Sequence, residues 1–117
     1  MLFPDGQVRV WLYTEPTDMR KSYTGLSTLV RNALKDNPLS GDVFVFVNRR
    51  RNLMKALYFD RTGYAIWSKK LAQGQFVYRT RGDTKQTLSL NELRCLVDGI
   101  EISNAKRYKR FTLPART

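Results

Sequence analysis

The chain has 117 residues, which suits one domain, and its 42% hydrophobic content supplies a packed core and excludes a disordered chain. Lysine and arginine number 21 against 10 acidic residues, giving a net charge of +11, whereas about 2 to 8 net charges keep a small domain soluble. The excess predicts a polyanionic partner, with nucleic acid as the leading candidate.

The first half of the chain predicts a strand, a helix and a second strand. Polar and apolar residues alternate over residues 8–13, which is typical of a strand. Apolar residues then recur at three- and four-residue steps from Met19 to Leu34, which predicts a helix capped by Asp18 or Thr17. The continuous β-branched and aromatic run over residues 43–47 predicts a central, well-buried strand.

A meander of strands is expected next. Residues 53–59 and 64–71 predict two strands, and residues 60–63 predict a type I turn closed by a left-handed glycine between them. A short fifth strand is expected around residues 76–78, and the polar stretch after it is expected to lead into a second helix.

That helix and a basic tail complete the chain. Ser89 and Glu92 have the spacing of a capping box, and Gly99 stops the helix. The element order indicates one α+β domain over residues 1–105, with a mainly antiparallel sheet of four to five strands and two helices that cover one face. Residues 106–117 contain many cations and no acid, and they predict a flexible arm.

Cysteine usage and hydropathy favour a cytoplasmic protein. Cys95 is the only cysteine, which excludes an internal disulfide and fits a reducing compartment. Its apolar sequence neighbours predict a buried structural thiol. No apolar run approaches the roughly 18 residues that cross a bilayer, and no signal-peptide pattern opens the chain. We therefore expect no membrane partner.

The sequence contains few residues that could act in catalysis. Histidine, the usual general base and a common metal ligand, is absent. A two-metal nuclease would need a carboxylate cluster, for which Asp60, Asp83 and Glu92 are the candidates. The expected turn accounts for Asp60 and the capping box for Glu92. We expect a protein that is not an enzyme and that has no catalytic residue, metal or cofactor.

Basic residues are concentrated between residues 49 and 85, where ten cations stand against two acids. Arginines at a tight turn make forked contacts to phosphate oxygens, although cations also serve to blunt strand edges. Two further cations at the expected start of the first helix oppose its dipole, so we add them as candidates. The predicted nucleic-acid-binding residues are Arg20, Lys21, Arg49, Arg50, Arg51, Lys55, Lys69, Lys70, Arg79, Arg81, Lys106, Arg107, Lys109 and Arg110.

Aromatic residues are interleaved with these cations. Trp67 and Tyr78 are the best candidates for stacking on unpaired bases, because Trp67 shares a strand face with Lys69 and Tyr78 precedes Arg79. The alternative is that both rings belong to the core of a small sheet, as most such rings do.

An ordered series of short motifs runs through residues 8–80: Asp18-Met19-Arg20-Lys21, Gly25-Leu26, Pro38, Ser40-Gly41, Phe44-Val45-Phe46, Asn48-Arg49-Arg50-Arg51, Lys55-x-Leu57, Asp60-x-x-Gly63, Lys69-x-Leu71 and Gly74-x-Phe76. In order and spacing this series resembles TnpB, the small accessory protein of insertion sequences of the IS-sixty-six type, which is unrelated to the RNA-guided nuclease of that name. The chain departs from the family pattern at Ser22, Asp42, Phe59 and Tyr78-Arg79.

The resemblance implies a helper for movement of the element, working beside a separate, larger transposase that carries the catalytic carboxylates. Together with the charge, it favours an accessory factor that binds nucleic acid, with DNA preferred over RNA. A non-catalytic module that docks on the transposase or a host factor is the alternative. Binding of single-stranded RNA is a weaker one.

Overall fold

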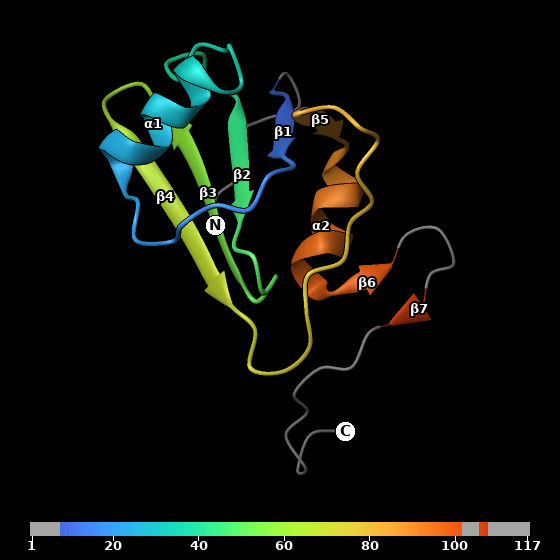
Figure 1. The fold of residues 1–117 in the computed structure, drawn as a ribbon. Coiled ribbons are helices and arrows are strands. Elements are labelled where there is room, and N and C mark those ends of the chain that lie inside the picture. The colour runs from blue at the N-terminus through green and yellow to red at the C-terminus, as the bar shows by residue number, and fades with distance from the viewer. Residues whose placement is uncertain (1–7, 102–105, 108–117) are drawn as a thin grey trace.

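The computed structural model describes residues 8–101 and 106–107. A five-stranded sheet forms its centre (Figure 1), in the order β4 (Tyr64–Lys70), β3 (Leu53–Phe59), β2 (Val43–Val47), β1 (Val10–Tyr13) and β5 (Lys85–Leu88). Three of the four neighbouring pairs are antiparallel, and β1 pairs with β2 in parallel. The expected α+β class with a mainly antiparallel sheet is confirmed, with one parallel pair that a pure meander lacks.

The parallel pair requires a crossover connection, which helix α1 (Tyr23–Asn32) supplies between β1 and β2. Leu26 and Val30 of α1 pack against Phe44 and Phe46 of β2 on one face of the sheet. This crossover brings the loop that follows β1 to the end of β2, where the candidate site lies.

The second helix, α2 (Leu90–Asp98), covers the opposite face of the sheet (Figure 1). Leu93 and Leu96 pack there against Leu12, Val45 and Met54. The expectation that both helices cover one face was therefore wrong. Alternate side chains of a strand point to opposite faces, so the five consecutive buried residues of β2 need cover on both sides.

The fifth strand was expected in the wrong place. Residues 76–78 are not a strand, and the sheet is completed by β5 (Lys85–Leu88), which pairs antiparallel with β1. Gln86 is buried within β5 because its side chain bonds to backbone groups: Nε2 donates to Arg79 O at 2.7 Å and Oε1 accepts from Arg81 N at 3.3 Å. These bonds allow a polar segment that lacks apolar alternation to form a strand.

Helix α1 begins at Tyr23, four residues after the expected start. Asp18 is not its cap, since Oδ1 accepts from Arg20 N at 2.9 Å in a turn that precedes the helix. Ser22 occupies the cap position without a side-chain bond to the helix. The cations Arg20 and Lys21 thus lie before the helix, and the prediction that they oppose its dipole from the first turn was wrong.

Two further local predictions have different outcomes. Strands β3 and β4 form the expected hairpin, but the left-handed residue in its loop is Arg61, with φ 85°, rather than the glycine. The capping box of α2 is confirmed, since Ser89 Oγ accepts from Glu92 N at 3.0 Å and Glu92 Oε1 accepts from Ser89 N at 2.8 Å. Gly99 ends α2 in the left-handed conformation, with φ 73°.

A small ladder follows α2, in which β6 (Ile100–Glu101) pairs with β7 (Lys106–Arg107). The division into a domain over residues 1–105 and a basic arm stays a prediction, because residues 108–117 lie outside the described part of the chain. Neither helix that the structure describes has the length and apolar content to cross a bilayer.

Candidate nucleic-acid interface

The turn between β2 and β3 is built around one asparagine. Asn48 Oδ1 accepts from the backbone N–H groups of Asn52 and Leu53, both at 3.0 Å, and its Nδ2 donates to Asn52 Oδ1 at 2.8 Å. Arg51 N also donates to Asn48 O at 3.0 Å. These bonds fix the backbone that carries Arg49 and Arg50 at the tip of the turn.

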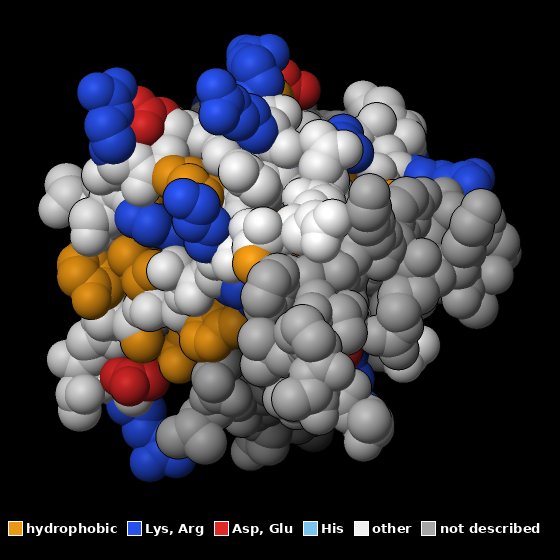
Figure 2. Space-filling model, turned by 90° about the horizontal axis from the view of Figure 1, so that it is seen from below, with side chains coloured by type: hydrophobic (Ala, Val, Ile, Leu, Met, Phe, Trp, Pro, Cys, Tyr) orange, Lys and Arg blue, Asp and Glu red, His pale blue; other side chains and the backbone are white. Residues whose placement is uncertain are grey.

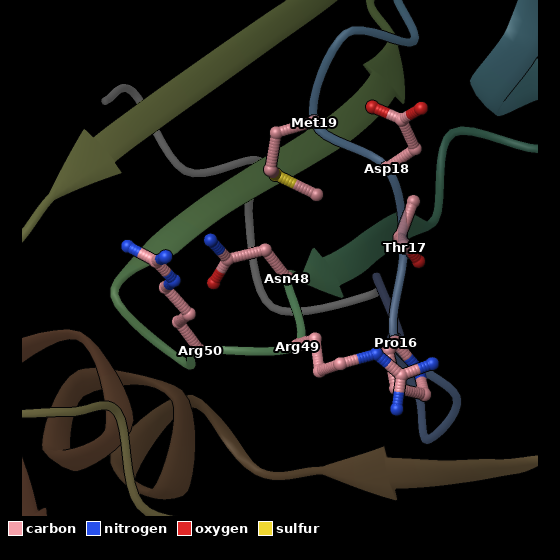
Figure 3. Close-up of a pocket in the computed structure, with 7 residues that line it drawn as sticks. All are labelled: Pro16, Thr17, Asp18, Met19, Asn48, Arg49 and Arg50. Atoms are coloured by element: carbon pink, nitrogen blue, oxygen red, sulfur yellow. The ribbon is translucent and has the colours of Figure 1, made fainter.

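Beside this turn lies a hollow of about 420 Å³ that is open to solvent (Figure 3). The loop after β1 contributes Pro16, Thr17, Asp18 and Met19, and the turn contributes Asn48, Arg49 and Arg50. Buried Thr17 donates its backbone N–H to Val47 O at 2.9 Å. This bond ties the loop to the end of β2, so the two walls of the hollow have a fixed separation.

Arg49 and Arg50 are exposed, and their guanidinium groups have no hydrogen bond or ion pair with any residue that the structure describes. Lys21 and Lys70 are also exposed cations without such a bond among the described residues. Lys70 lies near the turn, since it pairs with Leu53 at the start of β3, and Lys21 lies beside β3, since its carbonyl accepts from Lys55 Nζ. We call Lys21, Arg49, Arg50 and Lys70 the basic end of the sheet.

Arg51 differs from the two arginines before it. Its guanidinium carbon lies 4.1 Å from the centroid of the Tyr78 ring, and NH1 donates to Tyr78 O at 3.3 Å. Its own carbonyl accepts from Phe76 N. Arg51 therefore holds the irregular segment after β4 against the turn, and it contributes to the fold.

The same contacts define the surroundings of Tyr78. The ring is half-buried and packs against the core below α2, and this burial raises the pKa of its hydroxyl, which the Arg51 charge opposes. Trp67 is also half-buried and packs against that core. Stacking of a base on either ring stays a prediction; one face of Tyr78 is already covered by Arg51.

Three further cations of the predicted set, besides Arg51, bond to residues close to them in the fold. Lys55 Nζ donates to Lys21 O at 2.8 Å, which joins β3 to the segment before α1. Lys69 Nζ donates to Val97 O at 3.0 Å, at the carboxyl end of α2, where the helix dipole favours a cation. Arg20 forms a forked pair with Asp18, with NH2 at 2.7 Å from Oδ2, and these bonds lower the pKa of Asp18 to about 2.

The remaining predicted cations lie away from the turn or outside the described residues. Arg81 is exposed, with NH2 4.0 Å from Glu92 Oε2 at the start of α2, and Arg79 is exposed before it. Lys106 and Arg107 form β7. The structure does not describe Lys109 or Arg110.

Among the described residues, the basic side chains seen from this end of the sheet do not form one continuous patch. Figure 2 views the molecule from the end of the sheet that carries the β2–β3 turn, and Lys and Arg side chains appear there in several separate groups. Acidic side chains accompany some of these groups, and exposed hydrophobic side chains lie between them. Electrostatic contact with a polyanion would therefore be local rather than spread over the whole face.

Residues 16–19 were missed as a wall of the site, apart from the cap assigned to Asp18 or Thr17. Only the parallel pairing of β1 with β2 brings this loop to the turn, and no local sequence signal indicates it. Lys85 was also left out of the predicted set. Its Nζ lies 2.9 Å from Asp36 Oδ2 and 4.5 Å from the centroid of the Trp11 ring, and these contacts join β5 to the loop after α1 and to β1.

Among the described residues, no three His, Cys, Asp or Glu side chains are grouped so that they could hold a metal ion. Cys95 is a free thiol that is half-buried, so it is more exposed than its sequence neighbours indicate.

Comparison with known proteins matches the chain over most of its length. The model of a family described as IS66 Orf2 like protein matches residues 8–107. The uncharacterized protein y4hO of Sinorhizobium fredii (strain NBRC 101917 / NGR234) is 38% identical over 101 residues, which cover 86% of this chain and 88% of that protein. The uncharacterized protein y4jC of the same organism is 33% identical over 107 residues, 92% of each chain. No solved structure matches the chain.

Proposed function

This chain belongs to the IS66 Orf2-like family of insertion-sequence accessory proteins, and we propose that it assists transposition by binding DNA through the basic end of its sheet. One observation carries the proposal. Arg49 and Arg50 stand exposed on a turn whose backbone is fixed by Asn48, and neither guanidinium group is bonded to another described residue. Two such guanidinium groups can donate hydrogen bonds to phosphate oxygens without breaking any described bond.

The other members of the basic end extend this surface. Lys21 and Lys70 are exposed; Lys21 O accepts from Lys55 Nζ of β3, and Lys70 ends β4, which pairs with β3. By contrast, Arg51, Lys55 and Lys69 would each have to give up a hydrogen bond to reach a phosphate. We therefore assign phosphate contact to the basic end and structural roles to these three residues.

We also propose that the role is non-catalytic and that a separate transposase performs the chemistry. The sequence has no histidine, and a helper that positions DNA needs no reacting side chain of its own. Docking on the transposase is the competing role, in which the same cations meet an acidic protein surface.

Fluorescence anisotropy tests DNA binding directly. The protein is titrated against labelled duplex DNA at several salt concentrations, beside an Arg49→Gln/Arg50→Gln variant. The matched control is Arg31→Gln/Arg94→Gln, since both of these arginines are exposed on helices and each pair removes two charges from the net +11. Four phosphate contacts predict a logarithmic salt slope of about −4, which the Arg49/Arg50 variant should reduce by about 2.

Two results would overturn the proposal. A salt slope near zero would show that the protein makes no phosphate contacts. An equal loss of DNA affinity in the two double variants would show that only net charge matters. If the protein binds the purified transposase but does not bind bare DNA at low salt, the docking role replaces DNA binding.

A further inference from the structure

We propose that the hollow beside the β2–β3 turn receives an unpaired base, whose phosphate is held by Arg49 or Arg50. The protein would then prefer DNA with a single-stranded end over continuous duplex. This inference rests on the proposed function, since it specifies which form of DNA the basic end recognises.

The size of the hollow suits one nucleotide unit. Its volume of about 420 Å³ lies at the lower end of the roughly 300–1,000 Å³ typical of small-molecule sites. A base inside a duplex is stacked between its neighbours and paired, so it cannot enter a space between two loops. An unpaired base can be turned out of the strand and inserted.

The two walls offer different chemistry to the two parts of a nucleotide. Met19 points into the space between the loop and the turn (Figure 3), and Pro16 adds a second apolar surface at the other side. Thioether and apolar groups pack on aromatic faces, and a base in the hollow would offer such a face to Met19 and Pro16. Arg49 and Arg50 extend from the turn in different directions in Figure 3, with the Arg49 guanidinium drawn over Pro16 and the Arg50 guanidinium on the other side of Asn48, so a phosphate attached to that base would meet one of them.

Asp18 is the acidic residue that lines the hollow, and its carboxylate repels a bound phosphate only weakly. The carboxylate of Asp18 points away from the two arginines (Figure 3). It is held by Arg20 in a forked pair, with Arg20 Nε at 3.0 Å and NH2 at 2.7 Å from Oδ2. Arg20 offsets its charge, so a phosphate near Arg49 or Arg50 faces little repulsion.

Hydrogen bonds within the protein hold both walls of the hollow in place. The bond from Thr17 N to Val47 O fixes one wall, and the Asn48 side chain fixes the other. A site that is already ordered loses less conformational entropy when a ligand binds.

The test compares three labelled DNAs with the intact protein by anisotropy at one salt concentration. The first is a blunt duplex, the second has the same duplex with a four-nucleotide overhang, and the third has that overhang with abasic sites. Overhangs of both polarities are used. We expect the better overhang to bind about tenfold more tightly than the blunt duplex, and the abasic overhang, which keeps every phosphate, to lose most of that gain.

A protein variant adds an independent measurement. Met19→Ala should lose the preference for the normal overhang and keep the affinity for blunt duplex. Leu29→Ala is the control, because Leu29 packs at the edge of the same core cluster as Met19 but does not line the hollow. Its overhang preference should be unchanged.

The outcomes separate this inference from the proposed function. Equal affinity for blunt and overhanging DNA, or an abasic overhang that binds as tightly as the normal one, overturns the base site while DNA binding stands. Failure of every DNA to bind overturns both. The same duplex with a ribonucleotide overhang is titrated in parallel, and tighter binding of it than of the deoxyribonucleotide overhang overturns the assignment to DNA.

Discussion

At the residue scale, three consecutive arginines have two different roles. In sequence Arg49, Arg50 and Arg51 are equivalent candidates for phosphate contact, and no local pattern separates them. The distinction comes from Tyr78, which lies far along the chain and covers Arg51. The sequence therefore predicts a basic turn. Which of its arginines is exposed and which one supports the fold depends on tertiary contacts.

Substitution of these arginines should affect stability unequally. Arg51→Ala removes the bond to Tyr78 O and the ring contact, so we expect a loss of about 1–3 kcal/mol in the free energy of unfolding. Arg49→Ala, at an exposed site, should change it by less than about 0.5 kcal/mol. Urea denaturation followed by circular dichroism measures both, and equal effects would contradict the assignment.

Tyr78 predicts a specific loss of stability at alkaline pH. Burial raises the pKa of its hydroxyl in the folded protein above the ordinary value of 10.0, so the unfolded chain releases this proton first. The stability contributed by the neutral hydroxyl is present below about pH 10 and falls as the pH rises through the higher folded-state pKa. The Tyr78→Phe variant should lose less stability than the unmodified protein between pH 9 and 11. Urea midpoints that fall in parallel would refute this.

At the element scale, the most reliable predictions were those with a local physical cause. The capping box of α2 and the left-handed Gly99 follow from short-range hydrogen bonding, and both are confirmed. Strand β2 could be predicted as buried because its apolar run leaves no solvent face. β5 could not, because its stability comes from pairing with β1 and from the side-chain bonds of Gln86.

The two helix starts provide a matched test of capping. Ser89 accepts a bond from Glu92 N, so Ser89→Ala should cost about 1 kcal/mol, within the 0.5–2 kcal/mol typical of lost caps. Ser22 occupies the same position in α1 without a side-chain bond, so Ser22→Ala should cost clearly less. Comparison of the two urea midpoints at pH 7 checks this. A larger loss at Ser22 would mean that its hydroxyl does cap α1.

At the scale of the whole molecule, the proposed DNA-binding surface and the stability of the fold oppose each other. Net charge of +11 repels itself in the compact state, and the ion pairs described in the structure offset only a few of these charges. Screening by salt should therefore stabilise the free protein, so its urea midpoint should rise between 20 and 300 mM NaCl, while its affinity for DNA falls.

The Arg49→Gln/Arg50→Gln variant connects the two effects. Two fewer charges at the tip of one turn reduce repulsion, and no described bond is lost, so at low salt this variant should be at least as stable as the unmodified protein. It should nevertheless bind DNA more weakly, and added DNA should raise its melting temperature less, because ligand stabilisation scales with affinity. Thermal unfolding with and without duplex DNA measures both quantities in one experiment. A variant that is less stable without DNA would show that these arginines support the fold, as Arg51 does, and its weaker DNA binding would then have a structural cause.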